Sequence, residues 1–180
     1  MKFPFKISLT IIAVLCAALS LSAQPRSVGA LVGATGAKLS YQHRISAEQF
    51  VSIDAGVDLG YNVSGHPGAK VTGTYNFIWA KPKWTRQGSW SIYAGPGLSA
   101  GWVQDRVVVK TGEERANSFA DGFVVGVVGQ VGLEYCFEIP FSLALEIRPC
   151  IGLHMTDRTV SFYDNGFLGF IPSLAIRYPF

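Results

Sequence analysis

Alternation of apolar and polar residues with a period of two dominates the chain after residue 23. It is plainest at the C-terminus, where every second residue from Leu168 to Phe180 is apolar and most of the residues between them are small or polar. Side chains of a β-strand point alternately to its two faces, so such a segment predicts a strand with one apolar and one polar face. No helical stripe with a 3.6-residue period stands out after residue 23. The chain is therefore predicted to be all-β.

Eight segments carry this alternation. Most are close to the ~9–11 residues that a tilted transmembrane strand needs, and an even number of antiparallel strands returns both chain ends to one side. Longer connections are expected on the opposite side, at 62–70, 103–122 and 154–166, and shorter ones on the side of the termini. The eight predicted strands are about 27–32, 38–45, 51–61, 71–79, 90–102, 123–137, 141–154 and 168–180.

The two faces predict which way the strands point. A soluble up-and-down barrel would bury the apolar face, but these rows hold more large aromatic residues than a small barrel can enclose. If the apolar rows face outward to lipid instead, the aromatic residues need no room inside the barrel. The charged rows then point into the lumen, which in a barrel of eight strands is wide enough only for side chains. We expect the charged rows to fill it as ion pairs, since unpaired buried charges are costly. The alternative is a solvated sheet face. The predicted lumen network is Lys38, Arg44, Asp54, Asp58, Glu134, Glu146, Arg148 and Arg177.

Aromatic residues fall at the ends of the predicted strands, which is where bilayer interfaces would lie. A sheet that faces lipid must also close on itself, because lipid cannot satisfy an open strand edge. Pro96, Pro149 and Pro172 lie inside predicted strands and are expected to mark bulges or strand ends. The two bands comprise Trp79, Trp90, Phe137, Phe141, Tyr178 and Phe180 on the side of the termini, and Tyr61, Trp102, Phe123 and Phe167 on the other side.

The N-terminus is typical of a secretory signal peptide. Lys2 and Lys6 precede an apolar stretch at 7–21, and small residues follow, so cleavage is expected after Ser22 or Ala23. The alternative is an uncleaved membrane anchor. The predicted organisation is a signal peptide at 1–23 and a β-barrel domain at 24–180. Without the signal peptide the formal charge is close to +1, so the composition does not favour a nucleic-acid partner.

These features together resemble a known family. The export signal ending near Ser22-Ala23-Gln24, the eight amphipathic segments and the terminal Arg177-Tyr178-Pro179-Phe180 are similar to the outer-membrane protein β-barrel domain family, which includes small OmpA- and PorT-like barrels. The resemblance covers the whole mature chain. It implies an eight-stranded antiparallel up-and-down transmembrane β-barrel in a bacterial outer membrane, with both termini periplasmic. Its partners would be outer-membrane lipids and the barrel-assembly machinery, which Phe180 would address as the assembly signal.

Catalytic and metal-binding patterns are weak. Cys136 and Cys150 form neither a CxxC pair nor a zinc pattern with histidine, and their predicted separation of ~26 Å along the strands argues against a disulfide. We expect no cofactor, no metal site and no catalytic residue. The alternative is an enzyme that modifies lipid A, for which His154, close to Thr156, Asp157 and Ser161, would be the catalytic group.

The predicted function is a non-enzymatic, structural, adhesive or partner-binding barrel with a salt-bridged, non-conducting lumen. Its partner would be a periplasmic or extracellular protein. The longest connection, Val103–Gly122, is the expected contact surface. A second alternative is a barrel component of a secretion machinery, for which the basic connection Ala80–Ser89, with Lys81, Lys83 and Arg86, would be the docking element.

Overall fold

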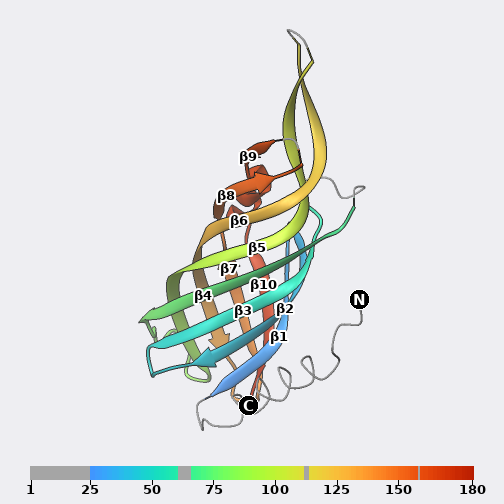
Figure 1. Cartoon of the computed structure of the whole chain (residues 1–180). Helices are drawn as coiled ribbons and strands as arrows, with labels where there is room; N and C mark the ends of the chain where they lie inside the picture. Colours follow the sequence, from blue (N-terminus) through green and yellow to red (C-terminus); the bar gives the residue numbers. More distant parts are fainter. Residues whose placement is uncertain (1–24, 61–65, 112–113, 158) are drawn as a thin grey trace, which may run out of the picture.

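The computed structural model describes residues 25–60, 66–111, 114–157 and 159–180. In these residues, ten β-strands form one antiparallel sheet (Figure 1). The sheet closes because β1 pairs with both β2 and β10, while β5 pairs with both β4 and β6. The strands are β1 (Arg26–Gly33), β2 (Gly36–Arg44), β3 (Gln49–Asp58), β4 (Gly68–Ala80), β5 (Ser89–Thr111), β6 (Glu114–Cys136), β7 (Ser142–Ile147), β8 (Cys150–Met155), β9 (Val160–Phe162) and β10 (Ser173–Pro179).

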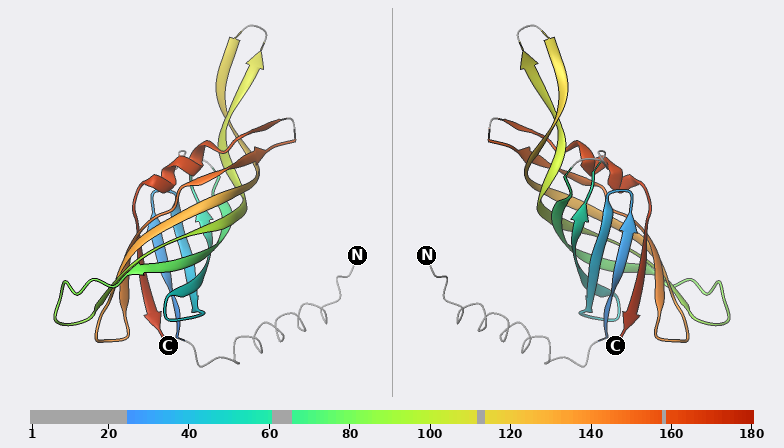
Figure 2. Two further views of the ribbon diagram at one scale, coloured as in Figure 1. Left: turned by 90° about the vertical axis from the view of Figure 1, so that its left-hand side faces the viewer. Right: turned by 90° about the vertical axis from the view of Figure 1, so that its right-hand side faces the viewer.

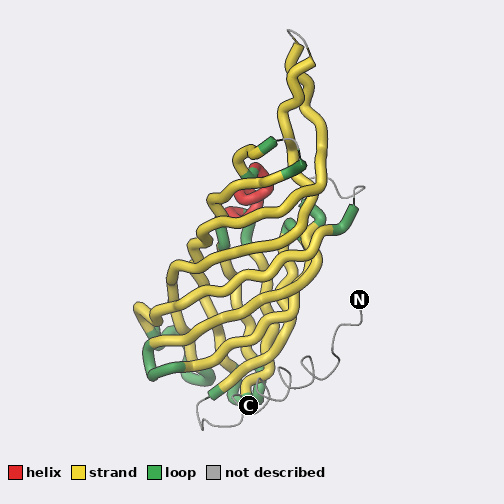
Figure 3. Tube along the Cα trace, in the orientation of Figure 1, coloured by secondary structure: helices red, strands yellow, loops and turns green. Residues whose placement is uncertain are grey.

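These strands occupy eight positions around the barrel. β7 and β8 follow one another along the same neighbour, β6, and β9 is a short hairpin partner of β8. The predicted closed, eight-stranded, all-antiparallel barrel is therefore confirmed for the described residues. The barrel is continuous over its length in the tube trace (Figure 3). No helix in the described part of the chain is long and apolar enough to cross a membrane.

The prediction of a loop at 103–122 was wrong. β5 and β6 continue pairing through this segment, from Val103 opposite Gly122 to Thr111 opposite Glu114. The paired strands project from the barrel as a long hairpin, which we call the 103–122 hairpin (Figures 1 and 2). Pairing satisfies the backbone hydrogen-bonding groups that a loop of this length would have to leave to water. Only the turn between the two strands lies outside the described residues.

The last predicted strand was too long. Asp164–Phe170 forms a 3-10 helix, η1, and β10 begins only at Ser173. Pro172 thus lies just before the strand, where its missing N–H removes no ladder bond. Pro149 stands in the break between β7 and β8, and its carbonyl accepts a bond from the Gly129 N–H at 3.0 Å. Pro96 lies in a gap of the β4–β5 ladder, between the pairs Phe77–Ala94 and Thr74–Gly97.

The two ends of the barrel differ. The start of β1, the end of β10 and the short connections 45–48 and 137–141 lie at one end, which we call the terminal end (Figure 2). The 103–122 hairpin, the β8–β9 hairpin and η1 lie at the opposite end, which we call the hairpin end. At the hairpin end, β1 and β2 join through Gly33–Gly36, and Gly36 has a φ of +132°. A Cβ at Gly36 would lie 2.4 Å from the Val57 carbonyl oxygen, so this turn requires glycine.

The outward rows of the barrel are apolar. Leu39, Leu98, Val127 and Ile151 are 60–73% exposed at intermediate heights. Exposed aromatic side chains lie above and below them, in two bands. The band at the terminal end comprises Phe77, Trp79, Trp84, Phe137, Phe141, Tyr178 and Phe180, and the band at the hairpin end comprises Trp102, Phe119, Phe123, Phe162, Phe167 and Phe170. Trp90, which was predicted in the first band, is half-buried and packs between Trp84 and Tyr135; Tyr61 lies outside the described residues.

Candidate functional site

The inward rows form the candidate site, because they carry the buried charges of the barrel. Each predicted lumen residue belongs to a row that points inward. The structure places Lys38 and Arg44 on β2, Asp54 and Asp58 on β3, Glu134 on β6, Glu146 on β7, Arg148 between β7 and β8, and Arg177 on β10. Six of them are buried, while Lys38 and Arg44 are partly exposed.

Arg177 is at the centre of this cluster and is fully buried. Its Nη2 lies 2.6 Å from Glu146 Oε1, and its Nη1 lies 3.7 Å from Glu134 Oε1. Its Nε also donates to Ser40 Oγ at 3.1 Å, so the guanidinium connects β10 to β2, β6 and β7. Glu134 accepts a further bond from Ser142 Oγ at 2.8 Å, and Glu146 accepts one from the Tyr93 hydroxyl. A charged group with this many partners is tolerated in a dry interior.

Arg148 extends the cluster across the lumen. Its Nη1 lies 2.5 Å from Asp54 Oδ2, and its Nη2 lies 2.5 Å from Glu146 Oε2. Glu146 therefore lies between two guanidinium groups, and Arg148 links β3 to the opposite wall of the barrel. Arg148 can reach Asp54 because the lumen is only wide enough for side chains. The two arginines and three carboxylates of Glu134, Glu146 and Asp54 form one connected network, which we call the central ion cluster.

Lys70 is a buried member of the lumen that was not predicted. Its Nζ lies 3.6 Å from Asp58 Oδ2 and donates to the Tyr163 hydroxyl at 3.0 Å. Burial raises the pKa of the Tyr163 phenol above its ordinary value, so this hydroxyl stays protonated. Lys70 was assigned to a loop at 62–70, but β4 begins at Gly68. Its sequence signal was available, because Lys70 shares the parity of the polar residues Thr72 and Thr74.

Lys38 and Arg44 do not join the central ion cluster, and within the described residues neither forms a direct ion pair. Lys38 lines a void of about 30 Å³ together with Lys70 and Arg148. A void of this size accommodates about one water molecule. Arg44 lies at the terminal end and lines a larger cavity there. The predicted set of eight therefore divides into a connected cluster of five, Asp58, which pairs with the unpredicted Lys70, and two flanking cations.

η1 covers the hairpin end of the lumen. The buried carboxylate of Asp105 on β5 accepts bonds from the backbone N–H groups of Asp164 at 2.7 Å, Asn165 at 3.2 Å and Arg106 at 2.8 Å. The Asn165 side-chain amide also donates to the Gln104 carbonyl at 2.8 Å. The Asp105 carboxylate, on a distant strand, therefore accepts hydrogen bonds from the first backbone N–H groups of the helix. Because Asp105 lies nearly 60 residues before η1, local sequence could not predict this arrangement.

Replacing Asp105 by alanine should release η1 without opening the barrel. The substitution removes the acceptor for three backbone N–H groups, and losing such a cap costs about 1–2 kcal/mol. We expect faster hydrogen exchange at Asp164 and Asn165 and unchanged exchange on β1 and β2. Asp157→Ala is the control, because Asp157 is exposed beyond β8. Unchanged exchange at η1 in Asp105→Ala would contradict this role.

His154 is not arranged for catalysis. The side chain is fully buried, and its Nε2 lies 3.2 Å from the Val103 carbonyl oxygen. Ser161 lies opposite His154, but its hydroxyl donates to the His154 backbone carbonyl at 3.5 Å and not to the ring. Thr156 bonds to Thr159 in its own turn. The geometry therefore does not join the serine and the imidazole into a nucleophile–base pair.

Three further predicted features have defined positions. The register places Cys136 opposite Ser142, and both described cysteines are free. In the described residues, no group of three or more histidine, cysteine, aspartate or glutamate side chains could hold a metal ion. Phe180 is 61% exposed, and its backbone exchanges two hydrogen bonds with Arg26 at 2.7 and 3.0 Å. The last residue thus extends the β1–β10 seam that closes the barrel.

Comparisons with known proteins found similarity in structure alone. No family model and no curated protein matches the sequence. The N-terminal β-barrel domain of Pseudomonas aeruginosa OprF is 10% identical, with a TM-score of 0.45, over 87% of this chain and 96% of that one. Neisserial surface protein A is 15% identical, with a TM-score of 0.38, over 87% of this chain and 92% of that one.

Proposed function

We propose that the protein is an integral β-barrel of a bacterial outer membrane with a non-enzymatic structural, adhesive or partner-binding role. The observation that carries this proposal is the outer surface. Between the two aromatic bands, the outward rows of the described strands contain no aspartate, glutamate, lysine or arginine. The nearest outward charges at the hairpin end are Asp121, between Phe119 and Phe123 on β6, and Arg106, opposite Phe119, so both lie at the level of the band itself. An exposed apolar surface that encircles a molecule is typical of contact with lipid.

The proposed orientation puts the terminal end in the periplasm and the hairpin end outside the cell. Bacterial barrels of this kind have short periplasmic turns and longer extracellular connections. The 103–122 hairpin would then extend beyond the lipid surface. Phe180 would serve as the assembly signal from the periplasmic rim, and residues 1–23 would be removed as a signal peptide.

The proposed lumen does not conduct ions. The central ion cluster fills the middle of the barrel, and η1 covers the hairpin end. Reconstituted in planar bilayers with concentrated KCl, the protein should add no stepwise conductance above that of the bare bilayer. Arg177→Lys, which keeps the charge of the cluster, serves as the matched control and should behave identically. Regular conductance steps from the unmodified protein would contradict a closed lumen.

The 103–122 hairpin is the proposed contact surface for a partner. Replacing residues 107–118 by Asn-Gly should join Arg106 to Phe119 through a tight two-residue turn. These two residues are already paired across the hairpin. The shortened protein should still fold, as judged by its heat-modifiable mobility on gels, but lose the partner cross-linked to it on intact cells.

The comparison variant changes the opposite end of the barrel. Lys81, Lys83 and Arg86 are exposed, so replacing all three by glutamine should leave both folding and the cross-linked partner intact. Loss of the partner in this variant, with the shortened hairpin still binding, would favour the secretion-machinery alternative. The lipid A enzyme lacks support of this kind, because the His154 ring bonds to a backbone carbonyl.

A further inference from the structure

A cavity of about 300 Å³ opens at the terminal end of the lumen. Its lining residues lie at the ends of the strands: Pro25 and Pro179 flank the β1–β10 seam, Arg44 ends β2 and Cys136 ends β6. Phe50 forms an apolar wall, packing edge-on against Tyr93 with ring centroids 4.9 Å apart. The cavity is separate from the void at the hairpin end, because the central ion cluster lies between them. Its volume suits a small molecule or the end of a peptide, not a folded partner.

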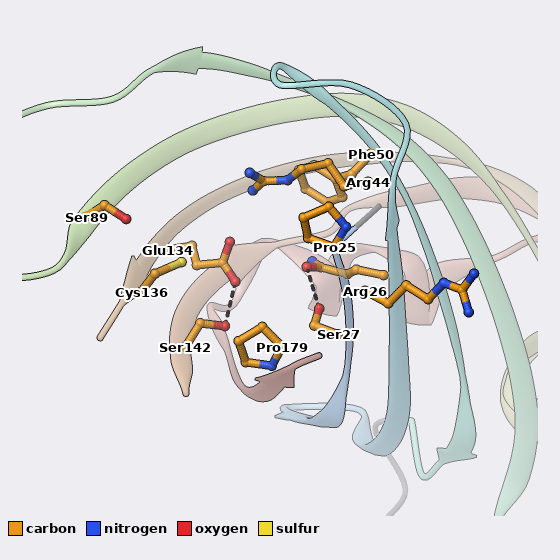
Figure 4. Close-up of a pocket in the computed structure, with 11 residues that line it drawn as sticks. Pro25, Arg26, Ser27, Arg44, Phe50, Ser89, Glu134, Cys136, Ser142 and Pro179 are labelled. Atoms are coloured by element: carbon orange, nitrogen blue, oxygen red, sulfur yellow. Dashed lines mark hydrogen bonds between the residues drawn. The ribbon is translucent and has the colours of Figure 1, made fainter. Parts of the chain in front are cut away.

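The polar groups of this cavity include two donors without an acceptor of their own. Gln42 is only 8% exposed, and its Oε1 accepts from Ser27 Oγ at 3.2 Å, but its Nε2 has no partner in the structure. Arg44 forms no direct ion pair within the described residues, and it extends toward the side of the opening lined by Glu134 and Cys136 (Figure 4). A buried amide N–H without a hydrogen bond is unfavourable, so an acceptor in the cavity would be stabilising.

The acidic residue of the cavity already has partners. Glu134 pairs with Arg177 and accepts from Ser142, so its charge belongs to the central ion cluster. The lining of the cavity contains two arginines, Arg26 and Arg44, but one carboxylate, so it has an excess of positive charge and of hydrogen-bond donors. A guanidinium presents a planar pair of N–H groups that matches the two oxygens of a carboxylate. Gln42 Nε2 is two residues away on the same inward row and offers a further donor.

We propose that this cavity binds a small carboxylate ligand, with the carboxylate held by Arg44 and Gln42 and the apolar part of the ligand against Phe50. The site borders the central ion cluster, whose Glu134 forms part of its lining, and lies at the opposite end of the barrel from the 103–122 hairpin. It would take a free organic acid or the C-terminal carboxylate of a peptide, which share this chemistry. Carboxylate binding at the barrel mouth does not depend on which partner the hairpin binds.

Benzoate and benzamide form a matched pair of probes for this site, because they differ only in the charged group. Added to the isotope-labelled, folded protein in detergent micelles, benzoate should cause saturable NMR shifts at the Gln42 side-chain amide and the Arg44 backbone. The dissociation constant should be on the order of millimolar for so small a ligand. Benzamide should bind at least about tenfold more weakly, since charge-assisted bonds are the stronger ones. A peptide with a free C-terminal phenylalanine, compared with its C-terminal amide, distinguishes a peptide source from a free acid.

Three variants test the assignment to residues. Arg44→Gln should weaken benzoate binding by about tenfold or more, and Arg44→Lys, which keeps the charge but loses the planar fork, by less. Arg86→Gln removes an exposed charge near the same end of the barrel and should leave binding unchanged. The heat-modifiable gel shift verifies that each variant is folded.

Several outcomes would overturn the proposal. Absence of saturable shifts would mean that the cavity holds water alone. Equal binding of benzamide, or unchanged binding in folded Arg44→Gln and Arg44→Lys, would show that no carboxylate is recognised by Arg44. Inorganic phosphate binding more tightly than benzoate would make the cavity an anion site of another class.

Discussion

Replacing Arg177 by methionine is expected to lower the free energy of unfolding by about 3–5 kcal/mol, the usual cost of removing one partner of a buried ion pair. Methionine fills much of the same space, so the effect comes mainly from charge. Within the described residues, Glu134 would lose its cationic partner, and Glu146 would keep Arg148. Ser40 would also lose the bond from the guanidinium. Urea unfolding of the protein in lipid vesicles, followed by the heat-modifiable gel shift, measures the change.

Two further variants isolate the cause. Arg86→Met removes an exposed arginine by the same substitution and should change the free energy by no more than about 0.5 kcal/mol. Adding Glu134→Gln to Arg177→Met should recover part of the loss, because the carboxylate left without a cationic partner disappears. If Arg177→Met were as stable as the unmodified protein, the central ion cluster would have no role in holding the barrel together.

Placing a charge on the outer surface should be the second large effect. Val131 is 52% exposed on β6, about midway between Phe123 and Phe137. In a membrane-embedded barrel, Val131→Arg should destabilise the fold by about 2–4 kcal/mol, the cost of an arginine near the bilayer midplane. Ile139 is 62% exposed in the turn beyond Phe137, so Ile139→Arg should cost only about 0–1 kcal/mol. The same vesicle unfolding assay compares the two.

The difference between these two variants is the informative quantity. Both replace an exposed, β-branched apolar residue by arginine, and they differ in height along the barrel. On a surface that faces water, neither substitution would be costly, and the two would agree within the usual ±0.5 kcal/mol of surface changes. Equal effects would therefore contradict a lipid-facing belt even if the barrel itself were intact.

The alternation of residue types was enough to predict the barrel because a strand converts sequence parity directly into two faces. Asp54, Glu146 and Arg177 point inward for this reason alone. In the segment that contains Glu146, the even-numbered residues point inward on both sides of the break between β7 and β8. Parity does not say which inward residues meet. The Arg148–Asp54 and Arg177–Glu146 pairs depend on the register of strands that are far apart in sequence.

The features that the sequence did not predict, which are η1, the partners of Lys70 and the cavity at the terminal end, all depend on residues far apart in the sequence. Asp105 supports the start of η1 from another strand, so Leu168–Phe170 looks like the beginning of a strand when its sequence is considered by itself. Lys70 was taken for a loop residue although its parity matches that of Thr72, and its partners, Asp58 and Tyr163, could not be predicted because they belong to other segments. The cavity at the terminal end is built from the ends of several strands, so no single segment predicts it.

The central claim is that the apolar rows contact hydrocarbon, and the solvent accessibility of spin labels on the outer surface tests it most directly. In a background with Cys136→Ser and Cys150→Ala, a label at Val131→Cys and a second at Ile139→Cys are compared in the protein reconstituted into vesicles. We expect the label at position 131 to collide readily with oxygen, which partitions into lipid, and hardly at all with a water-soluble nickel complex. The label at position 139 should show the reverse. Ready access of the nickel complex to position 131 in the folded protein would place water against that surface and contradict the account.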